Sequence, residues 1–259
     1  MNTVTALAGV VIKELYRRKD FYVLFVLTAL LTLVLGSVKF FHDDKIVRYL
    51  KEMCLLLIWI SALIIAIVTT ARQIPAEREN RTIFPLLAKP VTRAQVIAGK
   101  FLGCWLASGI VLLVFYIFFG VISGSREHQW PLLNYFQAMW LQWMMLAIVI
   151  SFVLFGSIVF AAPSSNNTIS FIIVVGILLI GRHLNEVALR QPEPLRTIVY
   201  TLYFFIPHLE WYDVRELIAF GQPLIPWQYC ALASLYAAFY GAFLLWAAWL
   251  VFRRKPLNA

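Results

Sequence analysis

Charged residues are scarce in this sequence. Asp, Glu, Lys and Arg together make up 14% of its 259 residues, whereas apolar residues make up 62%. A typical soluble domain is about 25% charged and about 45–50% apolar. The composition therefore excludes an ordinary soluble domain, and the length suffices for one membrane domain of about five to seven helices of roughly 20 apolar residues each.

Cysteine and histidine are also sparse, and neither type is clustered. The cysteines lie inside apolar blocks, which indicates small apolar side chains and not a disulfide framework; they are Cys54, Cys104 and Cys230. The histidines are far apart and have no metal-ligand spacing, so we expect no haem, zinc or other cofactor. All four are predicted to lie in loops: His42, His128, His183 and His208.

A nucleotide-binding motif is absent as well. The phosphate loop G-x-x-x-x-G-K-[ST] does not occur, since Gly99-Lys100 has Ala94 where that motif needs its first glycine. We therefore expect that the chain is not an enzyme and that any ATP hydrolysis takes place on a separate subunit.

The apolar residues occur in blocks long enough to cross a bilayer. In lipid the backbone must satisfy its own hydrogen bonds, so each block is predicted to be a helix. Six spans are expected, at 21–41, 53–71, 96–122, 138–162, 169–181 and 229–252. The fifth is short, and either extends to about Leu189 or is completed by a re-entrant segment. The predicted fold is all-α, with residues 1–259 forming one polytopic membrane domain.

The positive charges are unevenly divided between the two sides of this arrangement. Residues 1–20, 72–100, 163–168 (a predicted tight polar turn) and 253–259 hold 13 Lys and Arg against 4 Asp and Glu. Residues 39–52, 123–137 and 182–228 hold 9 of each. The positive-inside rule places the first set in the cytoplasm. We expect an inner or plasma membrane protein with both termini cytoplasmic, and a positive charge that reflects topology and not nucleic-acid binding.

Two further segments are predicted to lie at the membrane surface. Residues 1–20 have an apolar face with a period near 3.6, typical of an interfacial helix; this face consists of Val4, Leu7, Ala8, Val11, Ile12 and Leu15. The alternative is a plain cytoplasmic extension of the first span. Within the outer loop 182–228, residues 199–209 are apolar but too short to cross, so they are expected to be re-entrant or interfacial.

The stretch between the second and third spans is charged, then briefly apolar, then helical. Thr82 can cap a short helix over Ile83–Ala88, which Pro90 ends. Thr92 and Gln95 have the spacing of a capping box, in which each side chain bonds the backbone N–H of the other residue, so a new helix is predicted to begin there. Residues 72–95, the coupling segment, are expected to fold as a hairpin of helical pieces.

The residue order of the coupling segment resembles that of the permease subunits of ABC-2 type ABC transporters. That family has Glu-rich residues, then Gly-Thr, Leu-Leu, Pro-Val-Ser-Arg and Gly-Lys. The matching residues are Glu77, Glu79, Thr82, Leu86, Leu87, Pro90, Val91, Thr92, Arg93, Gly99 and Lys100. Arg81 stands where the family has Gly, and Thr92 where it has Ser.

This resemblance implies the six-span ABC-2 permease fold, with a coupling helix that docks in a groove of a separate ABC ATPase subunit. The implied docking interface consists of Glu77, Glu79, Arg81, Thr82, Ile83, Phe84, Leu86, Leu87, Pro90 and Arg93. The resemblance also implies a second permease subunit, identical or different, surrounding membrane lipids, and export of a substrate that the sequence does not identify.

Three other interpretations stay open at this point. The loop 72–100 could simply be a basic inner loop that contacts lipid headgroups. The positive-inside rule explains its positive charge but not its capped helices. A membrane-embedded enzyme would need a convergent catalytic set, and a redox anchor subunit would need histidines at span depth. The spans as placed contain almost no ionisable residue, which disfavours the last two.

The topology predicts which positions a reagent outside the cell can reach. In a background without the native cysteines, a Lys89→Cys variant should resist a membrane-impermeant thiol reagent applied to intact cells, because the coupling segment is expected to be cytoplasmic. Permeabilised cells provide the control, and rapid labelling in intact cells would contradict the topology.

Overall fold

The computed structural model describes residues 3–17, 26, 29–30, 33–34, 44–79, 91–127, 130–190 and 192–254. The described residues form helices and connections, with no strand among them. Within these described ranges, five helices are long and apolar enough to cross a membrane, which confirms the predicted all-helical membrane architecture. The first expected span, 21–41, lies almost entirely outside the described residues, so the sixth span stays a prediction.

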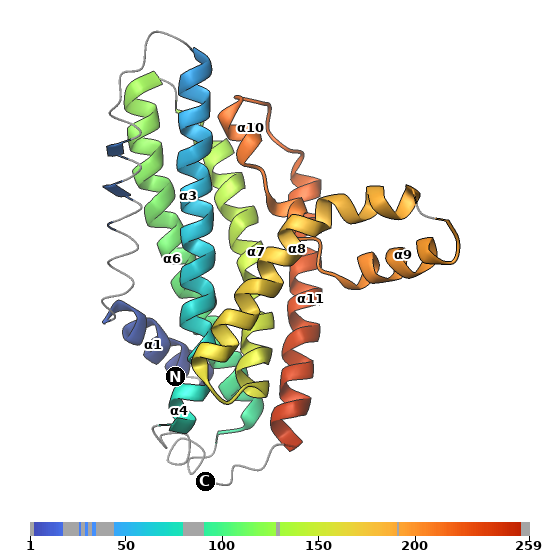
Figure 1. Cartoon of the computed structure of the whole chain (residues 1–259). Helices are drawn as coiled ribbons and strands as arrows, with labels where there is room; N and C mark the ends of the chain where they lie inside the picture. Colours follow the sequence, from blue (N-terminus) through green and yellow to red (C-terminus); the bar gives the residue numbers. More distant parts are fainter. Residues whose placement is uncertain are drawn as a thin grey trace.

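The long helices of the described part of the chain lie side by side and form its body (Figure 1). They are α3 (Asp44–Ala71), α6 (Arg93–Glu127), α7 (Leu132–Val159), α8 (Pro163–Arg190) and α11 (Trp227–Arg254). The shorter elements are α1 (Thr3–Tyr16), α4 (Pro75–Glu79), α9 (Leu195–Phe205), the 3-10 turn η1 (Leu209–Tyr212) and α10 (Arg215–Ala219). Helices α4 and α10 lie at opposite ends of the bundle, which we call the α4 end and the α10 end.

Helix α7 is the centre of the bundle. It packs against α3, α6, α8 and α11, and it is the most buried of the five long helices. Between α6 and α7, Trp105 and Trp143 stack with ring centroids 4.4 Å apart. Each indole N–H donates to the backbone carbonyl of the other residue, at 3.1 and 2.9 Å. These reciprocal bonds satisfy both indoles inside an apolar environment.

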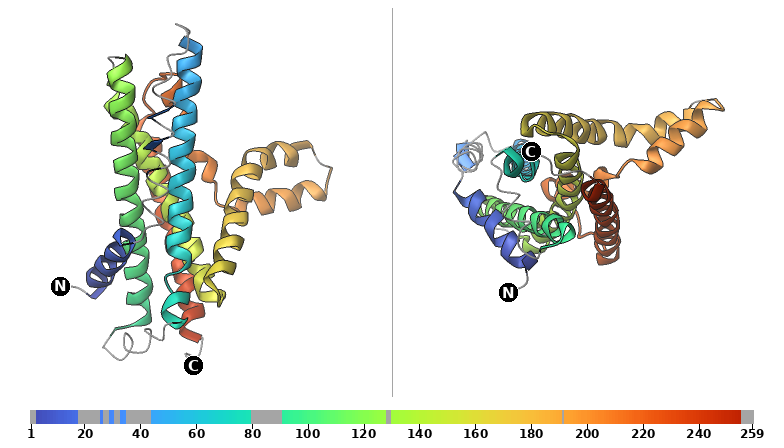
Figure 2. Two further views of the ribbon diagram at one scale, coloured as in Figure 1. Left: turned by 60° about the vertical axis from the view of Figure 1, so that its left-hand side comes forward. Right: turned by 90° about the horizontal axis from the view of Figure 1, so that it is seen from below.

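Helix α1 lies against the lower part of α6, at an angle to the long helices (Figure 2). The contact is close because α6 presents glycine there. A Cβ atom at Gly99 would lie 2.7 Å from the Cβ of Leu7, and one at Gly103 would lie 2.6 Å from the Cβ of Val11. Two residues of the predicted apolar face of α1 thus fill a notch between helical turns of α6.

The turn expected at 163–168 is wrong, because these residues form the first turns of α8. Proline is well suited to the first turn of a helix, and the Asn166 side chain is completely buried. Its Nδ2 donates to the backbone carbonyls of Ala71 (3.3 Å) and Val153 (3.2 Å), which belong to α3 and α7. Gly156 provides the space, since a Cβ atom there would lie 2.3 Å from the Asn166 Oδ1.

The later part of α8 bends away from the bundle, and α9 runs back beside it as a helical hairpin (Figures 1 and 2). Helix α8 continues to Arg190, close to the extension to about Leu189 given as one alternative, and it thus occupies the start of the expected outer loop. His183 therefore lies in a helix and not in a loop, and it is exposed beyond the apolar stretch that ends at Gly181.

The glycine notch between α1 and α6 can be tested by adding a single methyl group. Gly103→Ala should lower the melting temperature of the detergent-solubilised protein by about 2 °C or more, because overpacking typically costs about 1–3 kcal/mol. Gly9→Ala is the matched control, since no atom lies within 4 Å of a Cβ placed there. Equal melting temperatures for the two variants would rule out the close contact.

Candidate functional site

The α4 end contains a buried ion pair that joins two helices. Lys100, on α6, is only 3% exposed. Its Nζ donates to the Gln73 Oε1 at 3.0 Å and forms an ion pair with the Glu77 carboxylate. Gln73 lies in the turn after α3, and Glu77 lies in α4. A charge removed from water in this way needs partners, and these two hydrogen-bond acceptors provide them.

The start of α6 is fixed by the predicted capping box. The Thr92 backbone N–H donates to the Gln95 Oε1 at 2.9 Å, and the Gln95 backbone N–H donates to the Thr92 Oγ1 at 3.3 Å. Both of the capping-box bonds anticipated from the sequence are therefore present, and α6 begins at the next residue, Arg93.

Arg93 connects this helix start to the end of α11. Its guanidinium donates to the backbone carbonyls of Phe252 and Arg253, the latter at 3.0 Å, and lies 5.3 Å from the centroid of the Phe252 ring. Carbonyls at a helix C-terminus lack partners within the helix and carry partial negative charge. The positive charge of Arg93 offsets this partial negative charge. Some of the guanidinium N–H groups therefore bond α11 and not solvent.

The structure describes three of the predicted interface residues, and each has a different environment. Glu79 is exposed at the end of α4, whereas Glu77 is directed into the protein toward Lys100. Arg93 is half-buried against α11. The others lie outside the described residues: Arg81, Thr82, Ile83, Phe84, Leu86, Leu87 and Pro90.

A pocket of about 450 Å³ opens beside the first half of the coupling segment. Its walls are Arg72, Ala76, Glu79, Pro163, Ser164, Asn167 and Thr168, from the α3–α4 region and the start of α8. Arg78 lies close by, and its guanidinium donates to the backbone carbonyl of Ile158 at 3.5 Å. The α4 end thus has a pocket of mixed polar and apolar lining, to which three residues of the coupling segment contribute: Arg72, Ala76 and Glu79.

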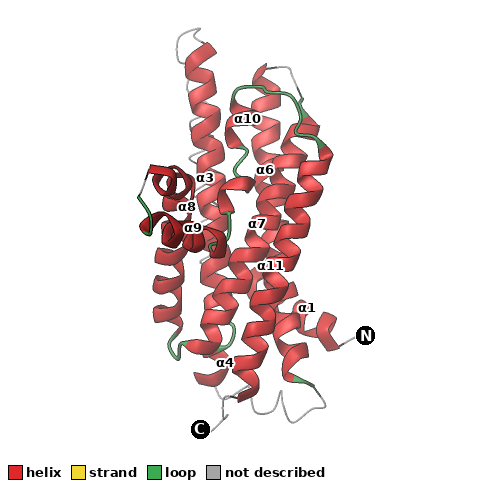
Figure 3. Ribbon diagram, turned by 90° about the vertical axis from the view of Figure 1, so that its right-hand side faces the viewer, coloured by secondary structure: helices red, strands yellow, loops and turns green. Residues whose placement is uncertain are grey.

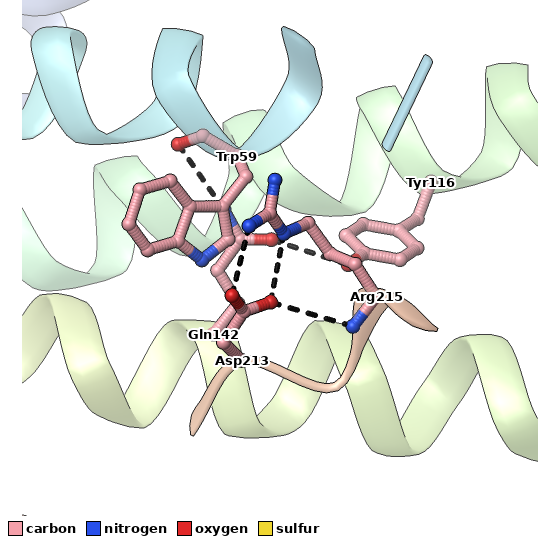
Figure 4. Close-up of polar contacts among 5 residues, drawn as sticks. All are labelled: Trp59, Tyr116, Gln142, Asp213 and Arg215. Atoms are coloured by element: carbon pink, nitrogen blue, oxygen red, sulfur yellow. Dashed lines mark hydrogen bonds and ion pairs between the residues drawn. The ribbon is translucent and has the colours of Figure 1, made fainter. Parts of the chain in front are cut away.

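A second polar cluster lies at the α10 end, where α10 meets α3 (Figure 4). The Arg215 guanidinium donates two hydrogen bonds to the Asp213 carboxylate, at 2.7 and 2.8 Å, and lies 5.1 Å from the centroid of the Trp59 ring. Burial on its own lowers the pKa of Arg215, but the hydrogen bonds and the negative charge of Asp213 outweigh that effect and raise the pKa. The guanidinium therefore stays charged.

Beneath this ion pair, uncharged polar groups join three long helices. The Tyr116 hydroxyl, on α6, donates to the Gln142 Oε1 on α7 at 3.1 Å. The Gln142 Nε2 donates to the backbone carbonyl of Trp59, on α3, at 3.5 Å. Gln142 therefore bridges α3, α6 and α7, as buried polar side chains in membrane helices commonly do.

Sequence reasoning missed Lys100, Asp213 and Arg215 as structural partners. Lys100 was counted as an inner-loop charge, and the other two were counted as outer-loop charges. One signal was present for Lys100: Gln73 and Glu77 are four residues apart, so a helix places them on one face. Nothing comparable in the sequence pairs Arg215 with Trp59.

A family model described as ABC-2 family transporter protein matches residues 10–252. A search of curated proteins found no match.

The Lys100–Glu77 pair can be tested by removing one charge and then both. Lys100→Met should reduce the free energy of unfolding by about 3–5 kcal/mol, because it leaves the Glu77 carboxylate in a poorly solvated position. Lys100→Met combined with Glu77→Gln should recover most of that loss. Unfolding in detergent measures both effects, with exposed Glu79→Gln as the control. A Lys100→Met variant as stable as this control would contradict the paired arrangement.

Proposed function

This chain belongs to the ABC-2 family of transporter proteins, and we propose that it is the permease subunit of an ATP-driven exporter. In this proposal the long helices form the translocation path. A separate ABC ATPase binds the coupling segment, and a second permease subunit completes the transporter.

The observation that carries the proposal is the attachment of both ends of the coupling segment to long helices. At its entry, Gln73 and Glu77 are bound to Lys100 on α6. At its exit, the capping box rigidifies the start of α6, and Arg93 bonds the last carbonyls of α11. A partner that displaces residues 80–90 would therefore displace α3, α6 and α11 together.

The energy source follows from what the chain lacks. Without a phosphate loop, the permease cannot position ATP phosphates itself. A nucleotide-dependent change can reach it only through a partner whose affinity differs between permease conformations. The coupling segment could transmit such a change, because its two ends are bonded to α6 and α11.

The docking surface combines apolar and charged side chains. Ile83, Phe84, Leu86 and Leu87 supply apolar area that an ATPase groove would cover. Glu79, exposed beside the pocket at the start of α8, supplies part of a polar rim. We propose that the ATPase covers both the segment and this pocket.

The topology of the proposal follows the charge distribution. The α4 end faces the cytoplasm, together with both termini, and the α10 end faces outward. The membrane is the plasma or inner membrane. Helix α1 rests at the cytoplasmic lipid surface, with Leu7 and Val11 held against α6 and its exposed residues near headgroups.

The proposal is tested by isolating the tagged chain from its native membrane and identifying proteins that copurify. We expect an ABC ATPase, and we expect ATP hydrolysis only by the complex. Turnover by the isolated chain that a point substitution within this chain abolishes would refute the assignment.

The docking surface is tested with three single variants in a pull-down of that ATPase. Phe84→Ala should weaken association strongly, because a buried interface aromatic often contributes about 2 kcal/mol or more. Thr92→Ala removes a cap of about 1 kcal/mol and should uncouple transport more than it prevents docking. Lys89→Ala is the control. If Lys89→Ala loses binding while Phe84→Ala retains it, the segment is an electrostatic membrane contact.

A further inference from the structure

Near the α10 end of the bundle, the segment between α9 and α11 packs against the long helices: α10 contacts α3 and α7, and η1 contacts α7 and α8. The loop joining α10 to α11 runs across the bundle near this end, and α3 extends beyond it (Figure 3). We call residues 208–226 the strap. Its contacts with α7 and α11 differ in chemistry from its contact with α3.

Direct hydrogen bonds attach the strap to α7 and α11. The Gln137 side chain of α7 forms two bonds with the backbone of Ile225, at 2.8 and 3.1 Å. Asn134, one turn earlier, donates to the backbone carbonyl of Gln222 at 3.1 Å. The Tyr212 hydroxyl donates to the backbone carbonyl of Ala233 on α11 at 2.7 Å. The His208 backbone N–H also donates to the Tyr236 hydroxyl of α11 at 3.2 Å, so five hydrogen bonds among the described residues hold this side of the strap.

The polar contact with α3 is made by the charge of Arg215. The guanidinium lies over the Trp59 ring, and Asp213 holds it there through two hydrogen bonds (Figure 4). Glu52 lies two turns from Trp59 on the same face of α3. The negative charge of its carboxylate also stabilises the charged guanidinium of Arg215. This contact has little directional constraint, so it can break and reform as α3 moves.

In the polar cluster around Gln142, the hydrogen bonding to α3 is weaker than the hydrogen bonding between α6 and α7. The bond from Gln142 to the Trp59 carbonyl is long, at 3.5 Å, whereas the bond from Tyr116 to Gln142 is 3.1 Å. Among the described residues, the buried Trp59 Nε1 has no hydrogen-bond partner. A buried donor without a partner favours any conformation that gives it one.

We propose that Arg215 is the latch of an outer gate: it holds α3 against the strap in this conformation and releases Trp59 when the path opens at the α10 end. The strap stays with α7 and α11, and α3 moves. Helix α3 suits this role because its other end leads directly into Gln73 and Glu77. The link to the coupling segment rests on the proposed function, whereas the latch contact itself does not.

The latch is tested by the accessibility of a cysteine placed behind Trp59. Ala62, one turn along α3, is 2% exposed and small enough for replacement by cysteine. In a background lacking Cys54, Cys104 and Cys230, Arg215→Met should increase labelling of Ala62→Cys by a charged reagent at the α10 end by about tenfold. Trp59→Leu should have a similar effect, and Arg215→Lys a smaller one.

Two controls separate a gate from a loss of structure. Arg196→Met removes another stacked guanidinium, 5.9 Å from the Tyr200 ring, and should leave labelling unchanged. Ala248→Cys reports on the core at the α4 end, where this residue is completely buried. If Arg215→Met increases labelling at both cysteines equally, or at neither, the latch is refuted.

A second measurement distinguishes the latch from the proposed function. With the ATPase bound, labelling of Ala62→Cys should differ at least threefold between the nucleotide-free complex and one trapped with ATP and vanadate. Equal labelling would refute the gate even if Phe84→Ala still abolishes docking. If no ATPase binds, the proposed function fails, yet the effect of Arg215→Met on the isolated chain would still support the latch.

Discussion

The ammonium group of Lys100 imposes the strongest constraint on how this bundle is assembled. Buried without partners, it would be too costly to retain its charge. The turn after α3 must therefore bring Gln73 and Glu77 to it, and that requirement fixes where α4 begins. Since α4 leads into the coupling segment, the geometry of the proposed ATPase contact depends on satisfying one charge inside the protein. Asn166 acts similarly on the other side, by joining α8 to the end of α3.

The sequence predicted what depends on local pattern. Apolar runs located five long helices, because lipid and protein interior both demand apolar side chains. The Thr92–Gln95 spacing located the start of α6, because a capping box involves only four consecutive residues. The apolar face of α1 identified Leu7 and Val11, which the structure places against glycines of α6.

What the sequence could not reveal depends on which distant groups meet. Asn166 was assigned to a turn because its neighbours are polar, yet carbonyls of two other helices make it a helical core residue. Arg215 was counted as a loop charge, and its partner Trp59 is more than 150 positions away. Arg93 was predicted to belong to the docking interface, and nothing in its sequence context indicated that its guanidinium also bonds the end of α11. Pairings across such separations leave no periodicity to detect.

The bond from Arg93 to the end of α11 also has a consequence for biosynthesis. The two residues that it joins are separated by 159 positions, so this contact forms only after the last helix has left the ribosome and entered the membrane. Until then, the exit of the coupling segment lacks one of its two attachments. A nascent or truncated chain would thus present an incomplete form of the proposed docking surface, because α11 would not yet hold Arg93.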